Sequence, residues 1–118
     1  MEINSKSFIL AKSFLGKEVE LIIDRPMGSK HPKHDFIYEC NYGYLPGVMA
    51  PDGEELDGYY FSESPLDKGI GLCVAIIHRL EDDDDKLVVV PAGVNLSDKE
   101  IEQKVRFQEK FFDHKIIR

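Results

Sequence analysis

The stretch I-G-L-C-V-A-I-I-H-R-L at residues 70–80 decides the fold. It is nearly all apolar, and the shorter run K-L-V-V-V follows at residues 86–90. Short apolar runs rich in branched side chains are typical of strands that are buried on both faces. The five acidic residues between the two runs, E-D-D-D-D at residues 81–85, form a polar connection. We therefore expect a central strand and its neighbour, joined as a hairpin.

Three further strands are expected before this hairpin, at residues 17–24, 36–44 and 58–61. The first of them alternates, with Val19, Leu21 and Ile23 on one face, which predicts a strand with one buried face. The second is rich in aromatic side chains and is expected to end at Pro46-Gly47, since this pair breaks regular structure. Strands therefore account for most of the middle of the chain.

A helix is expected near each end of the chain. Residues 5–15 predict a short helix that ends at Gly16. The second helix begins at Ser97, because Glu100 stands three residues later and the two form a capping box. Apolar residues then follow at helical spacing: Ile101, Val105 and Phe112.

About five consecutive strands followed by one helix favour a mainly β (α+β) fold, either a small antiparallel barrel or a strongly bent sheet. The C-terminal helix is expected to cover one opening or one flank of the barrel. The length of 118 residues suits one domain with a modest hydrophobic core, so we expect residues 1–118 to form a single domain.

The composition limits the classes of function. There are 15 Lys and Arg residues against 22 Asp and Glu residues, so the net charge is −7, which argues against a broad surface for nucleic acid or anionic membrane. The hydrophobic fraction of 42% and the mean hydropathy of −0.30 exclude disorder and a membrane protein. No signal peptide and no membrane-spanning segment is expected, which favours a cytoplasmic location. Cys40 and Cys73 lack metal or disulfide spacing, and Cys73 is expected to be a buried apolar residue.

The turn P-D-G at residues 51–53 opens the first candidate site. Four carboxylates fall within six residues, at Asp52, Glu54, Glu55 and Asp57. Two carboxylates 4 Å apart repel each other by about 4 kcal/mol at an effective dielectric constant of 20. A bound cation relieves this repulsion, and the alternative is a solvated acidic turn.

The acidic connection at residues 81–85 is the second candidate. Asp84 and Lys86 are two residues apart at the start of a strand, so their side chains are expected to point the same way and lie next to each other. The alternative is a hydrated hairpin tip. Nine of the 22 acidic residues fall in these two stretches, residues 52–57 and 81–85.

A third candidate is the basic segment of residues 24–34, which combines Asp24 with Arg25, Lys30 and Lys33. Arginine and lysine hold phosphate as a fork and as a point charge respectively, and the alternative is an exposed basic loop. The pair His31 and His34 is a weak metal signal. His78, within a strand, is expected to be a hydrogen-bonded structural histidine. The tyrosines of N-Y-G-Y at residues 41–44 either pack in the core or donate to a phosphoryl oxygen.

These segments together and in this order resemble the family I soluble inorganic pyrophosphatases. N-Y-G-Y at residues 41–44 is followed by D-G-x-x-x-D at 52–57, then by the acidic loop, D-x-K at 84–86 and V-P at 90–91. The match runs from about residue 19 to residue 91, and it continues more loosely through F-F-D-H-K at residues 111–115. The resemblance implies a compact five-stranded barrel related to the OB-fold and flanked by helices. It also implies hydrolysis of pyrophosphate to two phosphates with several Mg²⁺ ions, or with Mn²⁺ or another divalent cation.

The resemblance also implies roles for individual residues. The metal ligands would be Asp52, Asp57 and Asp84. A further ligand is expected in the acidic loop, where Asp82 is best placed and Glu81, Asp83 and Asp85 are the alternatives. Glu54 would act on the nucleophilic water. The substrate contacts would be Lys33, Tyr42, Lys86 and Lys115, with Arg25 in place of an arginine that the family carries elsewhere. The binding partner is then a small molecule, pyrophosphate. The sequence leaves open whether the chain forms a homo-oligomer.

Three departures from the family pattern bear on activity. Glu54 stands where the family has aspartate, only eight residues separate Lys33 from Tyr42 where the family has a long hairpin, and no tyrosine follows F-F-D-H-K. At a site sensitive to displacements of about 1 Å, the longer side chain of Glu54 alone can lower the rate. Two other functions therefore remain: a hydrolase of another phosphoanhydride (a nucleotide or a short polyphosphate), or a non-catalytic module that binds metal and pyrophosphate.

Overall fold

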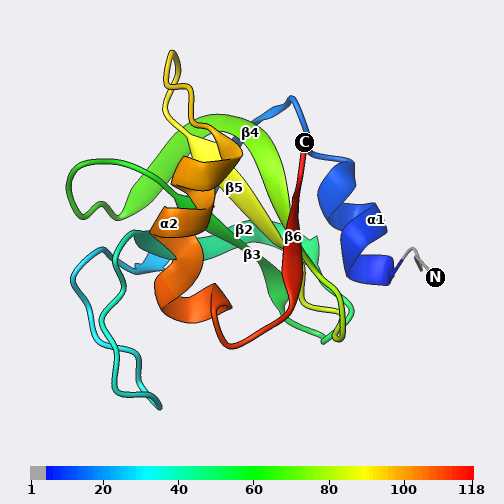
Figure 1. The fold of residues 1–118 in the computed structure, drawn as a ribbon. Helices are drawn as coiled ribbons and strands as arrows, with labels where there is room; N and C mark the ends of the chain where they lie inside the picture. Colours follow the sequence, from blue (N-terminus) through cyan, green and yellow to red (C-terminus); the bar gives the residue numbers. More distant parts are fainter. Residues whose placement is uncertain (1–4) are drawn as a thin grey trace.

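The structure, a computed structural model, describes residues 5–118 and shows a β-barrel with two helices against it (Figure 1). The first four residues of the expected domain lie outside the described part. The helices are α1 (Lys6–Lys12) and α2 (Asp98–Glu109). The strands are β1 (Glu18–Arg25), β2 (Asn41–Met49), β3 (Glu55–Tyr60), β4 (Lys68–Arg79), β5 (Lys86–Val90) and β6 (His114–Ile117).

Five strands close the barrel in the order β1-β2-β3-β5-β4, and β4 pairs again with β1. The expected five-stranded OB-like barrel is therefore confirmed. The expectation that the barrel is antiparallel throughout is wrong for one pair, since β3 and β5 run parallel. Directions cannot alternate around a closed ring with an odd number of strands, so at least one pair must be parallel. β6 lies outside this ring and pairs with the last residues of β4.

The central hairpin is confirmed, because β4 and β5 pair antiparallel and β4 also contacts β1 and β6. The expected strand at residues 36–44 is partly wrong. It begins only at Asn41, and it does not end at Pro46-Gly47 but continues to Met49. Gly47 has a φ of +78°, and the pairing with β3 shifts register between Tyr44 and Met49, so the strand bends at this pair instead of ending.

Both helices are confirmed, with changed boundaries. α1 is shorter than expected and begins at the N-cap Ser5. In the capping box of α2, the Glu100 backbone N–H donates to Ser97 Oγ at 3.1 Å and the Ser97 N–H donates to the Glu100 carboxylate at 2.9 Å. The expectation that Phe112 continues the helical spacing of Ile101 and Val105 is wrong. α2 ends at Glu109, and Phe107 is buried instead.

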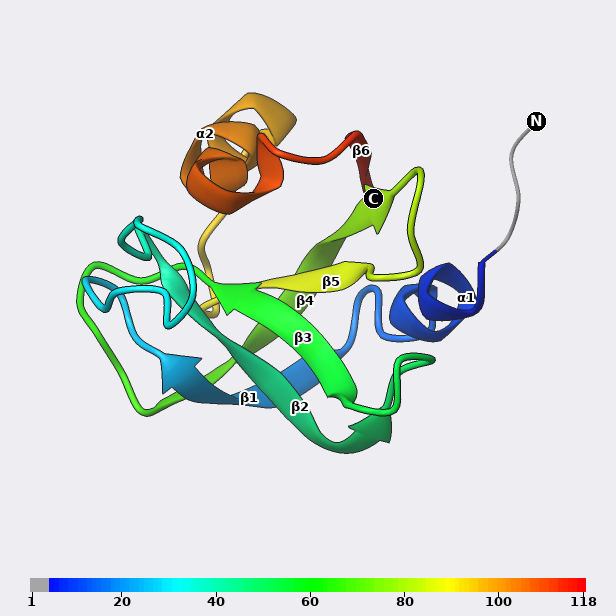
Figure 2. The same ribbon diagram turned by 90° about the horizontal axis from the view of Figure 1, so that it is seen from below.

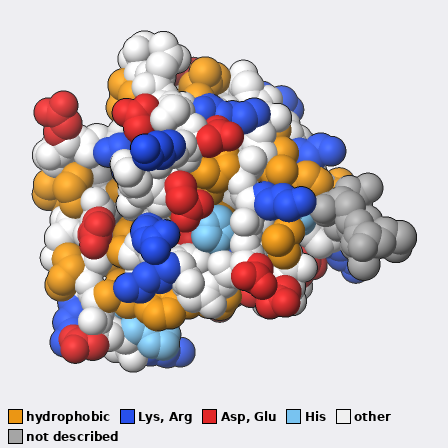
Figure 3. All heavy atoms as spheres, in the orientation of Figure 1, with side chains coloured by type: hydrophobic (Ala, Val, Ile, Leu, Met, Phe, Trp, Pro, Cys, Tyr) orange, Lys and Arg blue, Asp and Glu red, His pale blue; other side chains and the backbone are white. Residues whose placement is uncertain are grey.

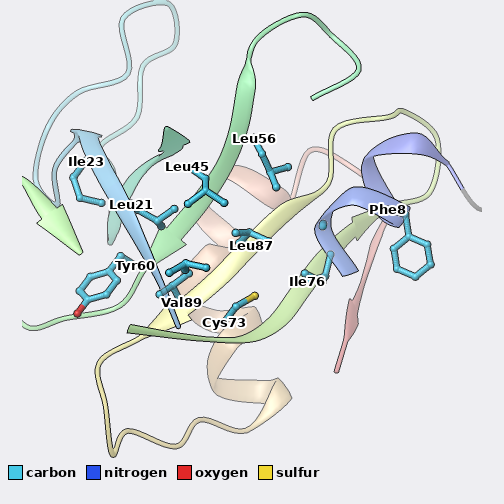
Figure 4. Packing of buried hydrophobic residues seen from close by; sticks show 12 residues of the cluster. Phe8, Leu21, Ile23, Leu45, Leu56, Tyr60, Cys73, Ile76, Leu87 and Val89 are labelled. Atoms are coloured by element: carbon cyan, nitrogen blue, oxygen red, sulfur yellow. The ribbon is translucent and has the colours of Figure 1, made fainter. Parts of the chain in front are cut away.

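Two apolar layers hold the barrel and α2 together. One fills the barrel interior with inward side chains such as Leu21, Leu56 and Leu87, and Figure 4 shows them converging between the strands. The other lies between the outer face of the barrel and α2, where Ile101 and Val105 are fully buried. Figure 2 shows α2 against a flank of the barrel and α1 near one end. The C-terminal helix therefore covers a flank, one of the two expected places.

The glycine of N-Y-G-Y has a clear structural reason. Gly43 pairs with Ile23 of β1, and a Cβ atom on it would overlap the backbone carbonyl of Ile22. Only glycine lets β1 and β2 approach this closely. Cys40 and Cys73 are buried free thiols, which confirms the expectation for Cys73. Neither α1 nor α2 is long and apolar enough to cross a membrane.

Candidate active site

A cavity of about 770 Å³ opens where the barrel, the 26–40 loop and the end of α2 meet. Six of the ten predicted site residues line it: Arg25, Tyr42, Glu54, Asp57, Asp84 and Lys86. The other lining residues are Asp24, His31, His34, Asp35, Phe36, Tyr38, Arg79, Phe107, Gln108, Lys110, Phe111 and Phe112. The fold thus brings together acidic, basic and aromatic side chains from segments that are distant in the sequence.

The acidic side of the cavity comes from the β2–β3 turn and from β3. The turn is tight because Gly53 has a φ of +87° and the Glu54 N–H donates to Asp52 Oδ1 at 2.9 Å. The expected turn at residues 51–53 is therefore confirmed. Glu54 and Asp57 reach the cavity, whereas Asp52 is not among the lining residues.

Asp57 has a perturbed carboxyl group. The Tyr42 hydroxyl donates to its Oδ2 at 2.9 Å. Burial raises the pKa of Asp57 to about 6, and the negative charges of Asp84 and Asp52 raise it as well, while Tyr42 and Lys86 act to lower it. A cation that enters the cavity would stabilise the ionised form of this carboxyl group.

Asp84 and Lys86 confirm the expected juxtaposition. Lys86 Nζ lies 3.3 Å from Asp84 Oδ2 and donates to it, and it lies 3.5 Å from Glu109 Oε2. Only 2% of the Lys86 side chain is exposed, because β5 holds its stem in the core. The ammonium group is therefore held between two carboxylates at the cavity wall.

The sequence alone did not point to Arg79 and Glu109, which the fold places beside Lys86. Arg79 Nε donates to Glu109 Oε1 at 2.7 Å, and only 3% of the Arg79 side chain is exposed. Burial raises the pKa of Glu109, but Lys86 and Arg79 lower it by more, so the group stays ionised. The only hint in the sequence is an arginine at the end of an otherwise apolar run, and its partner stands thirty residues later on α2.

A chain of hydrogen bonds leads from this ion cluster to the far side of the cavity. The Tyr59 hydroxyl donates to Glu109 at 2.7 Å and accepts from Gln108 at 2.6 Å. The Tyr38 hydroxyl donates to Gln108 at 3.1 Å and accepts from Arg25 at 2.9 Å. Buried polar networks in which every group is satisfied are rigid. The Tyr38 hydroxyl therefore holds the Arg25 guanidinium group in a defined orientation.

Asp82, Asp83 and Asp85 of the 81–85 loop have structural partners. Asp83 accepts from the Ser7 N–H at 2.8 Å, and Asp85 contacts His78 Nδ1 at 2.8 Å and accepts from the Arg79 N–H at 3.0 Å. His78 is therefore a hydrogen-bonded structural histidine, as expected. Asp82 contacts Arg79 at 2.9 Å and does not line the cavity. Its role as a metal ligand stays a prediction.

Lys33 and Lys115 lie outside the cavity. Lys33 is exposed in the 26–40 loop, and Lys115 is exposed on β6, where it pairs with His78 across the sheet. Lys110, after α2, lines the cavity instead. The substrate roles expected for Lys33 and Lys115 therefore stay predictions that the cavity does not support.

A metal ion fits the acidic wall in part. Within residues 5–118, no three His, Cys, Asp or Glu side chains are grouped closely enough to hold a metal ion by themselves. Asp57 and Asp84 do face the same cavity, and each offers carboxylate oxygens. Mg²⁺ typically takes one or two carboxylates and fills its other positions with water and substrate phosphate, so two carboxylates fit it.

Comparison with known proteins gives one consistent result. No protein-family model matches the chain. The chain is 29% identical over 98 residues to the inorganic pyrophosphatase of Rickettsia bellii, an alignment that covers 64% of this chain and 56% of the relative. It is 40% identical over 62 residues to that of Neisseria meningitidis, which covers 48% of this chain and 35% of the relative. The chain thus spans between about a third and just over half of the length of these relatives.

The fold comparison agrees with the sequence comparison. The crystal structure of an inorganic pyrophosphatase from Ehrlichia chaffeensis matches with a TM-score of 0.67 at 20% identity, over 86% of this chain and 85% of that one. One from Neisseria gonorrhoeae matches with a TM-score of 0.59 at 25% identity, over 75% and 70%. The expected resemblance to inorganic pyrophosphatases is therefore confirmed.

Proposed function

We propose that this protein hydrolyses inorganic pyrophosphate to two phosphates in the cavity between the barrel and α2, with Mg²⁺. One observation carries this proposal: carboxylates and buried cations face the same cavity on a barrel that resembles inorganic pyrophosphatases. Pyrophosphate carries several negative charges, so a wall of carboxylates alone would repel it. A site with both a metal-binding side and a cationic side suits such a substrate.

Asp57 and Asp84 are the residues proposed to hold the metal, with Asp52 next to them in the turn. When bound, Mg²⁺ lowers the pKa of a coordinated water and neutralises charge on the phosphates. The Tyr42 hydroxyl, 2.9 Å from Asp57, fixes the orientation of this carboxylate. The acidic side of the cavity is thus shaped before any ligand arrives.

Glu54 is proposed to orient or deprotonate the attacking water. It stands in the exposed turn and lines the cavity, and its backbone N–H is held by Asp52. No nucleophilic side chain is required, because water attacks phosphorus directly. One proton leaves the water toward Glu54, and the P–O bond to the departing phosphate breaks.

Lys86 and Arg25 are proposed to neutralise the charge that develops on the departing phosphate. Lys86 is held by Asp84 and Glu109, and Arg25 by Tyr38, so both cations keep their positions without substrate. Donors that are already in position need no rearrangement during the reaction. Arg79 contacts the same Glu109 carboxylate as Lys86 and is proposed to support it.

Phosphate release from pyrophosphate, measured with and without Mg²⁺, tests the proposal. We expect Mg²⁺-dependent release that Glu54→Gln nearly abolishes. Glu63→Gln is the matched control, because Glu63 is exposed and lies outside the cavity. Mg²⁺-dependent binding of pyrophosphate without any release would contradict hydrolysis and would favour a non-catalytic binding module.

A further inference from the structure

The cavity has a second wall, of which the proposed hydrolysis of pyrophosphate uses only the Tyr38 hydroxyl that holds Arg25. It is aromatic and comes from the 26–40 loop and from the segment at the end of α2. Its rings are His31, His34, Phe36, Tyr38, Phe107 and Phe111. In Figure 3, histidine side chains lie beside hydrophobic ones at the lower edge of the molecule, where Figure 1 draws this loop.

The rings of this wall are ordered around Phe36. The Phe36 ring lies nearly parallel to that of His34, with centroids 6.0 Å apart and planes at 8°, and it lies 6.3 Å from Phe111 at 27°. Phe107 and Phe36 pack edge to face, with ring centroids 5.9 Å apart and planes at 67°. Phe111 is 62% exposed although it lines a cavity. An open aromatic face therefore stands at the cavity mouth with a packed support behind it.

Tyr38 joins this wall to the proposed phosphate site. Its ring stacks on His31 with centroids 5.8 Å apart and planes at 12°. Its hydroxyl accepts a hydrogen bond from Arg25 at 2.9 Å. The aromatic wall thus ends at a cation that is proposed to bind phosphate, and Lys110 adds another positive charge beside Phe111, 5.3 Å from the ring.

The size of the cavity supports a larger ligand than pyrophosphate. Its volume of about 770 Å³ falls in the range of sites that hold drug-sized molecules, roughly 300–1,000 Å³. Pyrophosphate would occupy only the polar end. A ligand with phosphates at one end and a flat ring at the other would fill both ends.

We propose that this cavity binds a nucleoside triphosphate, with its phosphates toward Arg25 and Lys86 and its base against Phe36 and Phe111. The phosphate half of this inference rests on the proposed function, and the base half rests on the aromatic wall alone. Aromatic rings hold nucleobases by stacking with little dependence on the base, so purine and pyrimidine nucleotides are both accommodated. Water would attack a phosphorus atom of the triphosphate and form a new P–O bond, while the bridging P–O bond breaks and phosphate or pyrophosphate departs.

Calorimetric titration in the presence of Mg²⁺ tests the base half. Adenosine triphosphate is compared with ribose 5-triphosphate, which has the same sugar and phosphates but no base, in the Glu54→Gln background to suppress turnover. We expect the nucleotide to bind about tenfold more tightly. Phe111→Ala should reduce this ratio to near one, and Phe111→Trp should maintain it. Ile70→Ala is the control, since Ile70 is also exposed and apolar but lies outside the cavity.

The outcomes separate the two proposals. Equal binding of the two triphosphates, unchanged by Phe111→Ala, would overturn the nucleotide site even if pyrophosphate is hydrolysed. A nucleotide preference that depends on Phe111, without any pyrophosphate hydrolysis, would overturn the proposed function alone. If sedimentation shows a dimer that Phe111→Ala dissociates, the aromatic wall is an interface between copies of this chain and the nucleotide site is overturned as well.

Discussion

Asp57 lines the cavity, Glu109 is buried against Lys86 and Arg79 of its wall, and the protein treats these two carboxyl groups in opposite ways. Burial acts to raise the pKa of both. Asp57 is left at about 6, because the charges of Asp84 and Asp52 add to the effect of burial, whereas Glu109 is brought below its ordinary value by Lys86 and Arg79. The Glu109 carboxylate has two cationic groups within 3.5 Å, whereas the neighbouring carboxylates of Asp57 oppose its ionisation.

This difference separates the part of the site that is proposed to bind a ligand, at Asp57, from the part that stabilises the fold, at Glu109. A buried ion pair whose members also hydrogen-bond is part of the folded structure, and removing one partner leaves an uncompensated charge. A carboxylate with like charges around it weakens the fold and is retained for function. Mutations on the two sides should therefore separate stability from activity.

The largest effect is expected from Glu109→Ala, on stability. It leaves Arg79 and Lys86 buried with fewer partners, which should lower the free energy of unfolding by about 3–5 kcal/mol. Urea denaturation measures this change, and Glu109→Gln, which retains a hydrogen-bond acceptor, should lose less. Glu63→Ala serves as the exposed control and should stay within about 0.5 kcal/mol of the wild type. An unchanged midpoint for Glu109→Ala would show that the cluster does not support the fold.

The converse is expected of Asp57→Asn, where activity falls and stability does not. The amide removes a partly buried negative charge that has other carboxylates nearby, so the free energy of unfolding should stay equal or rise. Phosphate release should drop by about 100-fold or more, equivalent to at least about 2.7 kcal/mol in the barrier. Added Mg²⁺ should raise the urea midpoint of the wild type but not that of the variant, through binding to the folded state. A loss of stability comparable to that of Glu109→Ala would end the distinction between the two carboxylates.

A smaller effect is expected from Tyr42→Phe, which removes the hydroxyl group that donates to Asp57 at 2.9 Å. Leaving a buried acceptor with one donor fewer should cost about 1–2 kcal/mol of stability. Tyr44→Phe is the matched control from the same motif, because Tyr44 does not line the cavity. If the two variants unfold alike, the hydroxyl does not stabilise Asp57, and the orientation proposed for this carboxylate would need another source.

Much of the fold could be predicted from local patterns in the sequence, and so could part of the site. The alternation in β1 and the capping box of α2 are local, and the carboxylate–ammonium pair of Asp84 and Lys86 depends only on strand geometry. Arg79 and Glu109 could not be found in this way, because their contact depends on how α2 packs against the barrel. The aromatic wall could not be predicted for the same reason. Its rings come from the 26–40 loop and from the end of α2, which are distant in the sequence and come together only when the chain folds.

Two features of the C-terminal part could not be predicted from the sequence, for a different physical reason. β6 has four residues and little alternation of burial, so it is defined by its pairing with β4 and not by its own sequence. Lys115 is exposed on that strand and lies outside the cavity, while Lys110, directly after α2, lines it. A motif fixes the order of residues along the chain, but the packing of the segment after α2 decides which lysine lines the cavity.

The smallest predicted effect concerns the outer edge of the α2 side, where His114 of β6 lies 2.8 Å from the Glu102 carboxylate. Burial lowers the pKa of His114, but hydrogen bonds to the Phe112 carbonyl and to Glu102 raise it by more, so the net pKa lies above the ordinary 6.5. The folded state therefore binds this proton more tightly than the unfolded chain does. The resulting stability is fully present below pH 6.5 and is lost as the pH rises through the pKa of the folded state.

His114→Gln isolates this contribution, because the other titrating groups are shared with the wild type. The wild type should exceed the variant in stability by about 0.2–1 kcal/mol more in acid than in mildly alkaline solution, as measured by urea denaturation at several pH values. The buried pair of Glu109 and Arg79 should show no such dependence across this range, since both groups stay charged. A difference between wild type and His114→Gln that does not change with pH would show that the histidine joins β6 to α2 through packing alone, unlike the charged pair of Glu109 and Arg79.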